Sequence, residues 1–74
     1  MLVTIIYNKD FETEALSLRA DILNEWPGCN INRMGIENDF VGAKYQIQLE
    51  SKIIYKDIVP VDNTTIINSI KERL

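Results

Sequence analysis

An almost continuous run of apolar and β-branched residues opens the chain, from Leu2 to Tyr7. Such a run is typical of a strand that is buried on both faces or lies in the middle of a sheet. A short polar segment follows and separates this run from the next apolar positions. We therefore expect a central strand over residues 2–7, followed by a polar loop.

The apolar positions after this loop recur at steps of three or four residues, which predicts a helix. Asp10 can cap it, with Glu12 and Glu14 in its first turn, where negative charge meets the positive end of the helix dipole. The predicted buried stripe, flanked by Leu16 and Leu23, consists of Phe11, Ala15, Leu18, Ile22 and Trp26. The helix should end at Pro27 and Gly28, because proline cannot continue it and glycine allows a tight reversal.

The middle of the chain predicts a weak strand, a loop and a second clear strand. Cys29–Met34 reads as the weak strand, and Gly35–Gly42, with a glycine at each end, reads as the loop. Strict alternation follows over Ala43–Leu49, where Tyr45 and Ile47 share one face and the lysine and glutamines share the other. This pattern predicts a strand with one polar face.

A hairpin and a last helix complete the pattern. Glu50 and Ser51 are a short enough connection to join the strand before them to Lys52–Lys56 as a hairpin. Asp62 or Asn63 can then cap a helix. The residues predicted to form its apolar face are Ile66, Ile67, Ile70 and Leu74.

The resulting order, βαβββα, predicts the fold class. Short connections and right-handed crossovers make the first two strands parallel neighbours, and the hairpin adds antiparallel strands. Because each helix has a single apolar stripe, we expect a two-layer α/β domain in which a four-stranded mixed sheet carries both helices on one face. With 74 residues, the chain is expected to form one domain, residues 1–74. The other face would meet solvent or a partner.

Composition and charge exclude several classes of function. Hydrophobic residues make up 46% and charged residues 26%, as in ordinary folded domains, and the net charge of -3 with scattered Lys and Arg disfavours nucleic acid as a partner. A single cysteine, Cys29, cannot form an internal disulfide. The apolar run that opens the chain lacks the basic segment of a signal sequence and is too short to span a membrane. We expect a cytoplasmic protein with no membrane partner.

The order and several local motifs resemble the Rdx family of selenoprotein W and its bacterial thiol relatives, a branch of the thioredoxin-like fold. The resemblance covers essentially the whole chain. It rests on an apolar strand ending in Tyr7, on the helix-ending Trp26, Pro27 and Gly28, and on Gly42 ahead of the strand that contains Tyr45. The resemblance implies a thioredoxin-like sheet, with its functional loop between the first strand and the first helix.

That loop departs from the family. The redox motif Cys-x-x-Cys, or Cys-x-x-selenocysteine, falls here on Asn8, Lys9, Asp10 and Phe11. Dithiol exchange needs one thiolate to attack and a second thiol to resolve the mixed disulfide, and this loop has neither. The resemblance therefore implies the shape of the family without its chemistry.

We expect a protein that is not an enzyme and that binds another protein, as a small regulator or a phage or viral inhibitor would. The predicted contact surface is Asn8, Lys9, Asp10 and Phe11 together with the loop from Ile36 to Gly42. A monothiol redox protein acting through Cys29 is the alternative, and a ferredoxin-like nucleic-acid binder is a third, which lacks the basic face it needs. No cofactor is expected, because no phosphate-binding glycine pattern occurs.

Each candidate also has a structural explanation. Cys29 follows a helix-ending turn and shares its parity with Ile31, so it can be a packed small hydrophobe. Capping and the helix dipole account for the three carboxylates near the loop, and without histidine they predict no metal site. Trp26 and Tyr45 fall on apolar stripes and are expected in the core, whereas Phe11 is either the start of the core stripe or an exposed contact.

Overall fold

The computed structural model of the protein describes residues 1–37 and 43–74. The elements follow the predicted order, with one addition, a short 3₁₀ helix ahead of the first α-helix. They are β1 (Leu2–Asn8), η1 (Lys9–Phe11), α1 (Glu12–Glu25), β2 (Asn30–Ile36), β3 (Tyr45–Leu49), β4 (Lys52–Asp57) and α2 (Asn63–Arg73).

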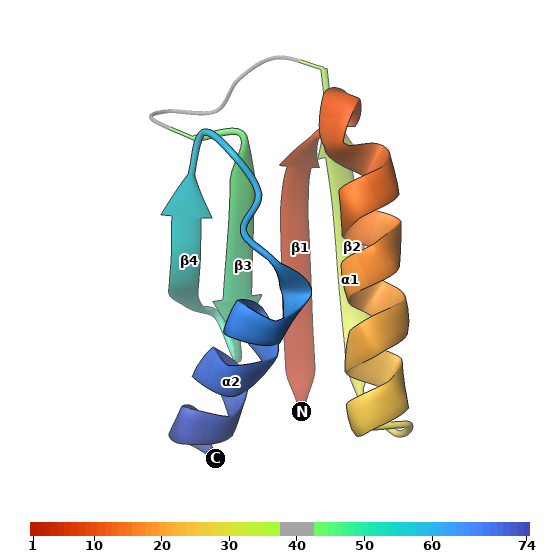
Figure 1. Cartoon of the computed structure of the whole chain (residues 1–74), viewed down its shortest axis with the longest axis vertical. Coiled ribbons are helices and arrows are strands. Elements are labelled where there is room, and N and C mark those ends of the chain that lie inside the picture. Colours follow the sequence, from red (N-terminus) through yellow and green to blue (C-terminus); the bar gives the residue numbers. More distant parts are fainter. Residues whose placement is uncertain (38–42) are drawn as a thin grey trace.

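The strands form one mixed sheet in the order β2-β1-β3-β4. β1 runs parallel to β2 and antiparallel to β3, which is in turn antiparallel to β4. Both helices lie against the same face of this sheet, so the molecule has two layers (Figure 1). The predicted α/β layout is confirmed.

The core lies between the sheet and the two helices. Alternate residues of the central strands point into it, because neighbouring side chains in a strand face opposite sides of the sheet. The α1 stripe contributes Ala15, Leu18 and Ile22, and α2 contributes Ile66 and Ile70. From the strands come Val3, Ile5, Tyr7, Tyr45, Ile47 and Leu49.

The hairpin between β3 and β4 is confirmed. Glu50 and Ser51 both have a positive φ, 51° and 74°, in the left-handed region that tight two-residue hairpin turns require. Further along β4 the pairing shifts, since Ile47 faces Tyr55 while Gln48 faces Ile53. Ile54 is thus an extra residue in β4 and forms a bulge.

β2 is longer than expected, because it includes Gly35 and Ile36, which were predicted to begin a loop. Both lie beside β1, where Gly35 pairs with Tyr7 and Ile36 with Asn8. The Tyr7 ring covers Gly35 so closely that an added Cβ would lie 3.0 Å from the tyrosine hydroxyl. Pairing with a central strand therefore extends β2. The rest of that predicted loop, residues 38–42, lies outside the described residues.

Two expectations about the helices were wrong. Leu74 does not join the buried face of α2; it is 71% exposed at the C-terminal end. Asp10 does not cap α1, because η1 precedes the helix and Phe11 occupies the cap position with no side-chain hydrogen bond. Asp62 does cap α2, as one of the two predicted alternatives, and accepts from Thr65 N at 3.1 Å. Neither helix in the described part of the chain is long and apolar enough to cross a membrane.

Candidate functional site

The loop predicted to bind a partner lies where β1 ends and α1 begins. In Figure 1 this is the upper end of β1, beside the upper end of α1. β2 ends at the same side, because it runs parallel to β1. Side chains from Asn8 to Phe11 and that of Glu37, the residue after β2, therefore lie at the same end of the sheet.

Asn8 has a structural role in this loop. Its side chain is only 6% exposed, and its Oδ1 accepts a hydrogen bond from the backbone N–H of Asp10 at 3.0 Å. Its own backbone N–H donates to the carbonyl of Lys44 at 2.8 Å. Asn8 thus ends β1 and caps η1, the role that the sequence pattern had assigned to Asp10 for α1.

Lys9 and Asp10 are exposed. Lys9 Nζ lies 3.2 Å from Glu37 Oε1, so an ion pair links the loop to the chain just beyond β2. Both partners are mostly in solvent, and such pairs contribute at most about 1 kcal/mol to stability. The pair therefore shows that Lys9 and Glu37 are neighbours, but it contributes little to the stability of the fold.

Phe11 combines the two alternatives that the sequence left open. It is half-buried, and its ring meets that of Tyr45 edge to face, with centroids 6.4 Å apart. Tyr45 in turn meets Tyr55 at 6.2 Å. Phe11 begins the core stripe at this aromatic row while part of its surface remains accessible.

Tyr45, predicted to be a core residue, is fully buried. Among the described residues its hydroxyl has no hydrogen-bond partner. Burial raises its pKa to about 12, and the neighbouring Glu14 and Tyr55 add to this effect. The phenol therefore stays protonated at neutral pH.

One charged side chain near the loop, Arg33, was not singled out from the sequence, whereas Glu37 belongs to the predicted contact loop from Ile36 to Gly42. Arg33, on β2, donates to the Tyr7 hydroxyl at 3.3 Å and lies 3.8 Å from Glu12. Glu37 meets Lys9. Most residues of β2 are exposed and its alternation of apolar and polar residues is weak, so no pattern indicated which face of the sheet Arg33 would take.

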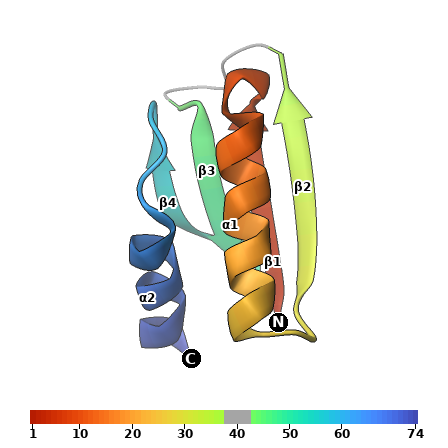
Figure 2. The ribbon, with the colours of Figure 1, turned by 45° about the vertical axis from the view of Figure 1, so that its right-hand side comes forward.

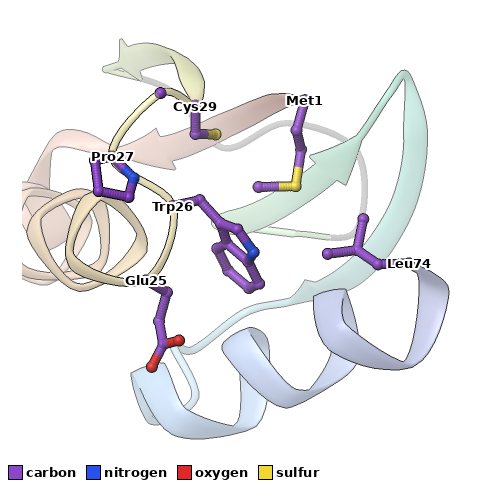
Figure 3. A pocket seen from close by; sticks show the side chains of 7 residues that line it. Met1, Glu25, Trp26, Pro27, Cys29 and Leu74 are labelled. Carbon is purple, nitrogen blue, oxygen red and sulfur yellow. The ribbon is translucent and has the colours of Figure 1, made fainter.

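Cys29 lies at the opposite end of the sheet, immediately before β2. It lines a hollow of about 410 Å³ whose wall is mainly apolar, and Figure 3 shows side chains from both ends of the chain around it. The lining residues are Met1, Glu25, Trp26, Pro27, Gly28, Cys29 and Leu74. Trp26, expected in the core, is half-buried at this wall.

The environment of Cys29 does not activate its thiol. Partial burial is the main cause that raises its pKa, with the Glu50 carboxylate adding to it against the opposite effect of the terminal amine. A higher pKa leaves less thiolate at neutral pH, and the thiolate is the reactive form. The thiol packs against the core, as its parity with Ile31 indicated.

No group of three or more His, Cys, Asp or Glu side chains within residues 1–37 and 43–74 is arranged to hold a metal ion. The loop from Asn8 to Phe11 contains no cysteine, serine or threonine. Comparison with known proteins found no matching protein family, curated protein or solved structure. What the site can do is therefore argued from its own geometry.

Proposed function

We propose that this protein is a thioredoxin-like domain of the Rdx type that has no dithiol chemistry and acts in the cytoplasm by binding another protein. One observation carries the proposal: the loop at the end of β1, where the resemblance places the family's Cys-x-x-Cys motif, holds two solvent-exposed charged residues and a half-exposed aromatic ring. A small regulator or inhibitor of another protein fits such a surface.

The surface comprises Lys9, Asp10 and the accessible part of Phe11. Asn8 supports it from beneath through its bond to Asp10. An exposed charged pair beside an aromatic side chain suits protein recognition, because aromatic anchors contribute much of the binding energy while rim charges steer the encounter. The raised pKa of Cys29 argues against the alternative of a monothiol redox protein.

Affinity capture from a lysate of the native host tests the binding surface. We compare the parent, a charge-swapped Lys9→Glu/Asp10→Lys variant, and Lys52→Glu as the matched control. Lys52 is also an exposed charge, but it begins β4 at the other end of the sheet. The parent and the control should retain the same protein and the swapped variant should lose it, with equal melting temperatures. Equal capture by all three would show that the loop is not the contact surface.

The absence of redox activity is tested separately. With dithiothreitol as the electron source, the parent should reduce insulin disulfides no faster than a Cys29→Ser variant, which has no thiol at all. Turnover by the parent above this control would establish Cys29 chemistry and contradict the proposal.

A further inference from the structure

The outer edge of β2 has unpaired backbone groups. The N–H of Asn30 donates to the carbonyl of Met1 at 3.0 Å, so Asn30 turns its polar groups toward β1. Because these groups alternate in direction along a strand, Ile31, Arg33 and Gly35 turn theirs outward. No strand within residues 1–37 and 43–74 pairs with this edge, and Figure 2 shows β2 at the outer side of the sheet.

The two edges of the sheet differ in how well they are protected. Natural proteins protect edges with lysines, prolines and bulges, which prevent a further strand from pairing. β4 has a bulge at Ile54 and exposed lysines at positions 52 and 56. β2 is a regular seven-residue strand without proline, lysine or bulge, and Arg33 is its only charged residue. β2 is therefore the edge that can accept another strand.

We propose that a second copy of this chain pairs with β2 in antiparallel orientation, about a twofold axis at Met34. In this register Arg33 lies opposite the partner's Gly35, and Gly35 lies opposite the partner's Arg33. These outward-facing residues exchange N–H···O=C bonds with one another, and the two sheets become continuous. Both copies keep the same face toward their helices, as a twofold axis perpendicular to the sheet requires.

Charge and apolar area favour this register over axes at Arg33 and Asn32. An axis at Arg33 would set two like charges directly opposite, which is destabilising. An axis at Met34 instead gives Arg33 a glycine opposite it and the partner's Glu37 on a diagonal, so acidic charge from Glu37 balances the two arginines. It also brings together the two copies of Met34, each 52% exposed on the face without helices.

An axis at Asn32 would oppose two amides at the centre and set Met34 against the partner's Asn30. That register buries less apolar surface than the pairing of two methionines. A single pair of strands is small beside the roughly 1,600 Å² of a standard interface. We therefore expect a weak dimer whose population depends on protein concentration.

Sedimentation velocity over protein concentrations up to about 1 mM, where even a weak pair with Kd near that value is populated, tests the dimer. The parent should shift toward a dimer as concentration rises. Met34→Lys should abolish the shift, because two ammonium groups would then face each other. Ile53→Lys is the matched control: Ile53 is also 52% exposed on the same face, but lies on β4. Its variant should dimerise like the parent.

A parent that stays monomeric at every concentration would overturn the proposal and leave the β2 edge to a foreign strand. Equal loss of the dimer in both lysine variants would overturn the choice of edge. Thermal melting of the three proteins at low concentration should agree, since both positions are half exposed.

Cross-linking tests the register. In a Cys29→Ser background, Met34→Cys should form a disulfide-linked dimer on mild oxidation, because directly opposed residues of this kind have Cα atoms about 4.5 Å apart, within disulfide range. Asn32→Cys is the control, since its two copies would be offset by about 13 Å along the strands. Equal yields from the two positions would indicate random collision and contradict the register.

Discussion

Asn8 and Asp10, two positions apart, have different roles in the loop. Both residue types can cap helices, and their sequence positions alone favoured Asp10. In the structure Asn8 is the cap instead. Its backbone N–H donates to the Lys44 carbonyl, and this contact orients its side chain to accept from the Asp10 N–H. A capping role depends on where a tertiary contact anchors the backbone as well as on residue type.

Asn8→Ala should therefore lower the free energy of unfolding by about 1 kcal/mol or more, the usual cost of losing a cap. Asp10→Ala, at an exposed position, should change it by no more than about 0.5 kcal/mol. Urea denaturation of both variants measures the difference. A larger loss for Asp10→Ala than for Asn8→Ala would restore Asp10 as the cap.

Tyr45 allows a prediction about alkaline stability. Its folded pKa of about 12 lies above the value near 10 of an exposed tyrosine. Between these values the unfolded chain releases a proton that the native protein keeps, so the stability present below pH 10 is lost as pH rises toward 12. Tyr45→Phe should therefore show a smaller decrease in the free energy of unfolding between pH 10 and pH 12 than the parent.

At neutral pH the same substitution should leave stability unchanged or raise it, because it removes a buried hydroxyl that has no partner among the described residues. Tyr7→Phe is the comparison, since the Tyr7 hydroxyl accepts from Arg33. Denaturation curves at neutral and alkaline pH give both results. A marked loss in Tyr45→Phe at neutral pH would reveal a hydrogen bond to that hydroxyl.

At the scale of elements, α1 follows its sequence pattern closely. Its buried residues, Ala15, Leu18 and Ile22, repeat at helical spacing and face the sheet. Leu16, which flanks this stripe, is 46% exposed. Burial thus depends on position around the helix rather than on hydrophobicity alone.

Leu18→Ala or Ile22→Ala should destabilise the protein by about 2 to 5 kcal/mol, the range for truncating a fully buried aliphatic side chain. Leu16→Ala removes the same atoms as Leu18→Ala from a half-exposed position and should cost much less. Melting temperatures of the three variants test the assignment. Near-parental melting of both buried-site variants would mean that the stripe is misplaced.

The whole molecule has two central strands and two edge strands. β1 and β3 are paired on both sides, whereas β2 and β4 are each paired on one side by described residues. Backbone amides that are unpaired and close to solvent open most easily. Protection should therefore decrease from the centre of the sheet to its edges.

Hydrogen exchange at low protein concentration should show alternation along β2. The amides of Ile31, Arg33 and Gly35 should exchange quickly, and those of Asn32 and Met34, which face β1, more slowly. At high concentration Arg33 and Gly35 should become protected if two copies pair. Uniform exchange along β2 in the dilute sample would contradict the directions derived from the Asn30 bond.

Much of the fold could be predicted from local patterns. The apolar run of β1 indicated a central strand and the spacing of α1 indicated one buried face, because the geometry of a strand or helix repeats over a few residues. The alternation of β3 correctly indicated its core face, but Gln46 on the predicted polar face is also buried. The same local physics predicted the hairpin at Glu50 and Ser51, without the usual Asn-Gly pair. The order of elements then restricted the topology.

The candidate site was less predictable. The sequence indicated the loop from Asn8 to Phe11, but could not show that Asn8 is buried or that Phe11 both packs and remains partly accessible. These properties come from Lys44 and Tyr45, more than thirty positions away. No local pattern encodes a contact over such a separation.

The sequence by itself determined the four strands, the two α-helices, most of the residues that face the core and the absence of a thiol pair in the loop. Only the tertiary structure decided the cap at Asn8, the extension of β2 through Ile36 and the charged neighbours that, with burial, shift the pKa values of Cys29 and Tyr45. The physical reason is the separation in sequence over which each interaction acts. Periodicity reflects the repeat of one element, whereas capping, strand ends and desolvation depend on neighbours that only the folded chain brings together.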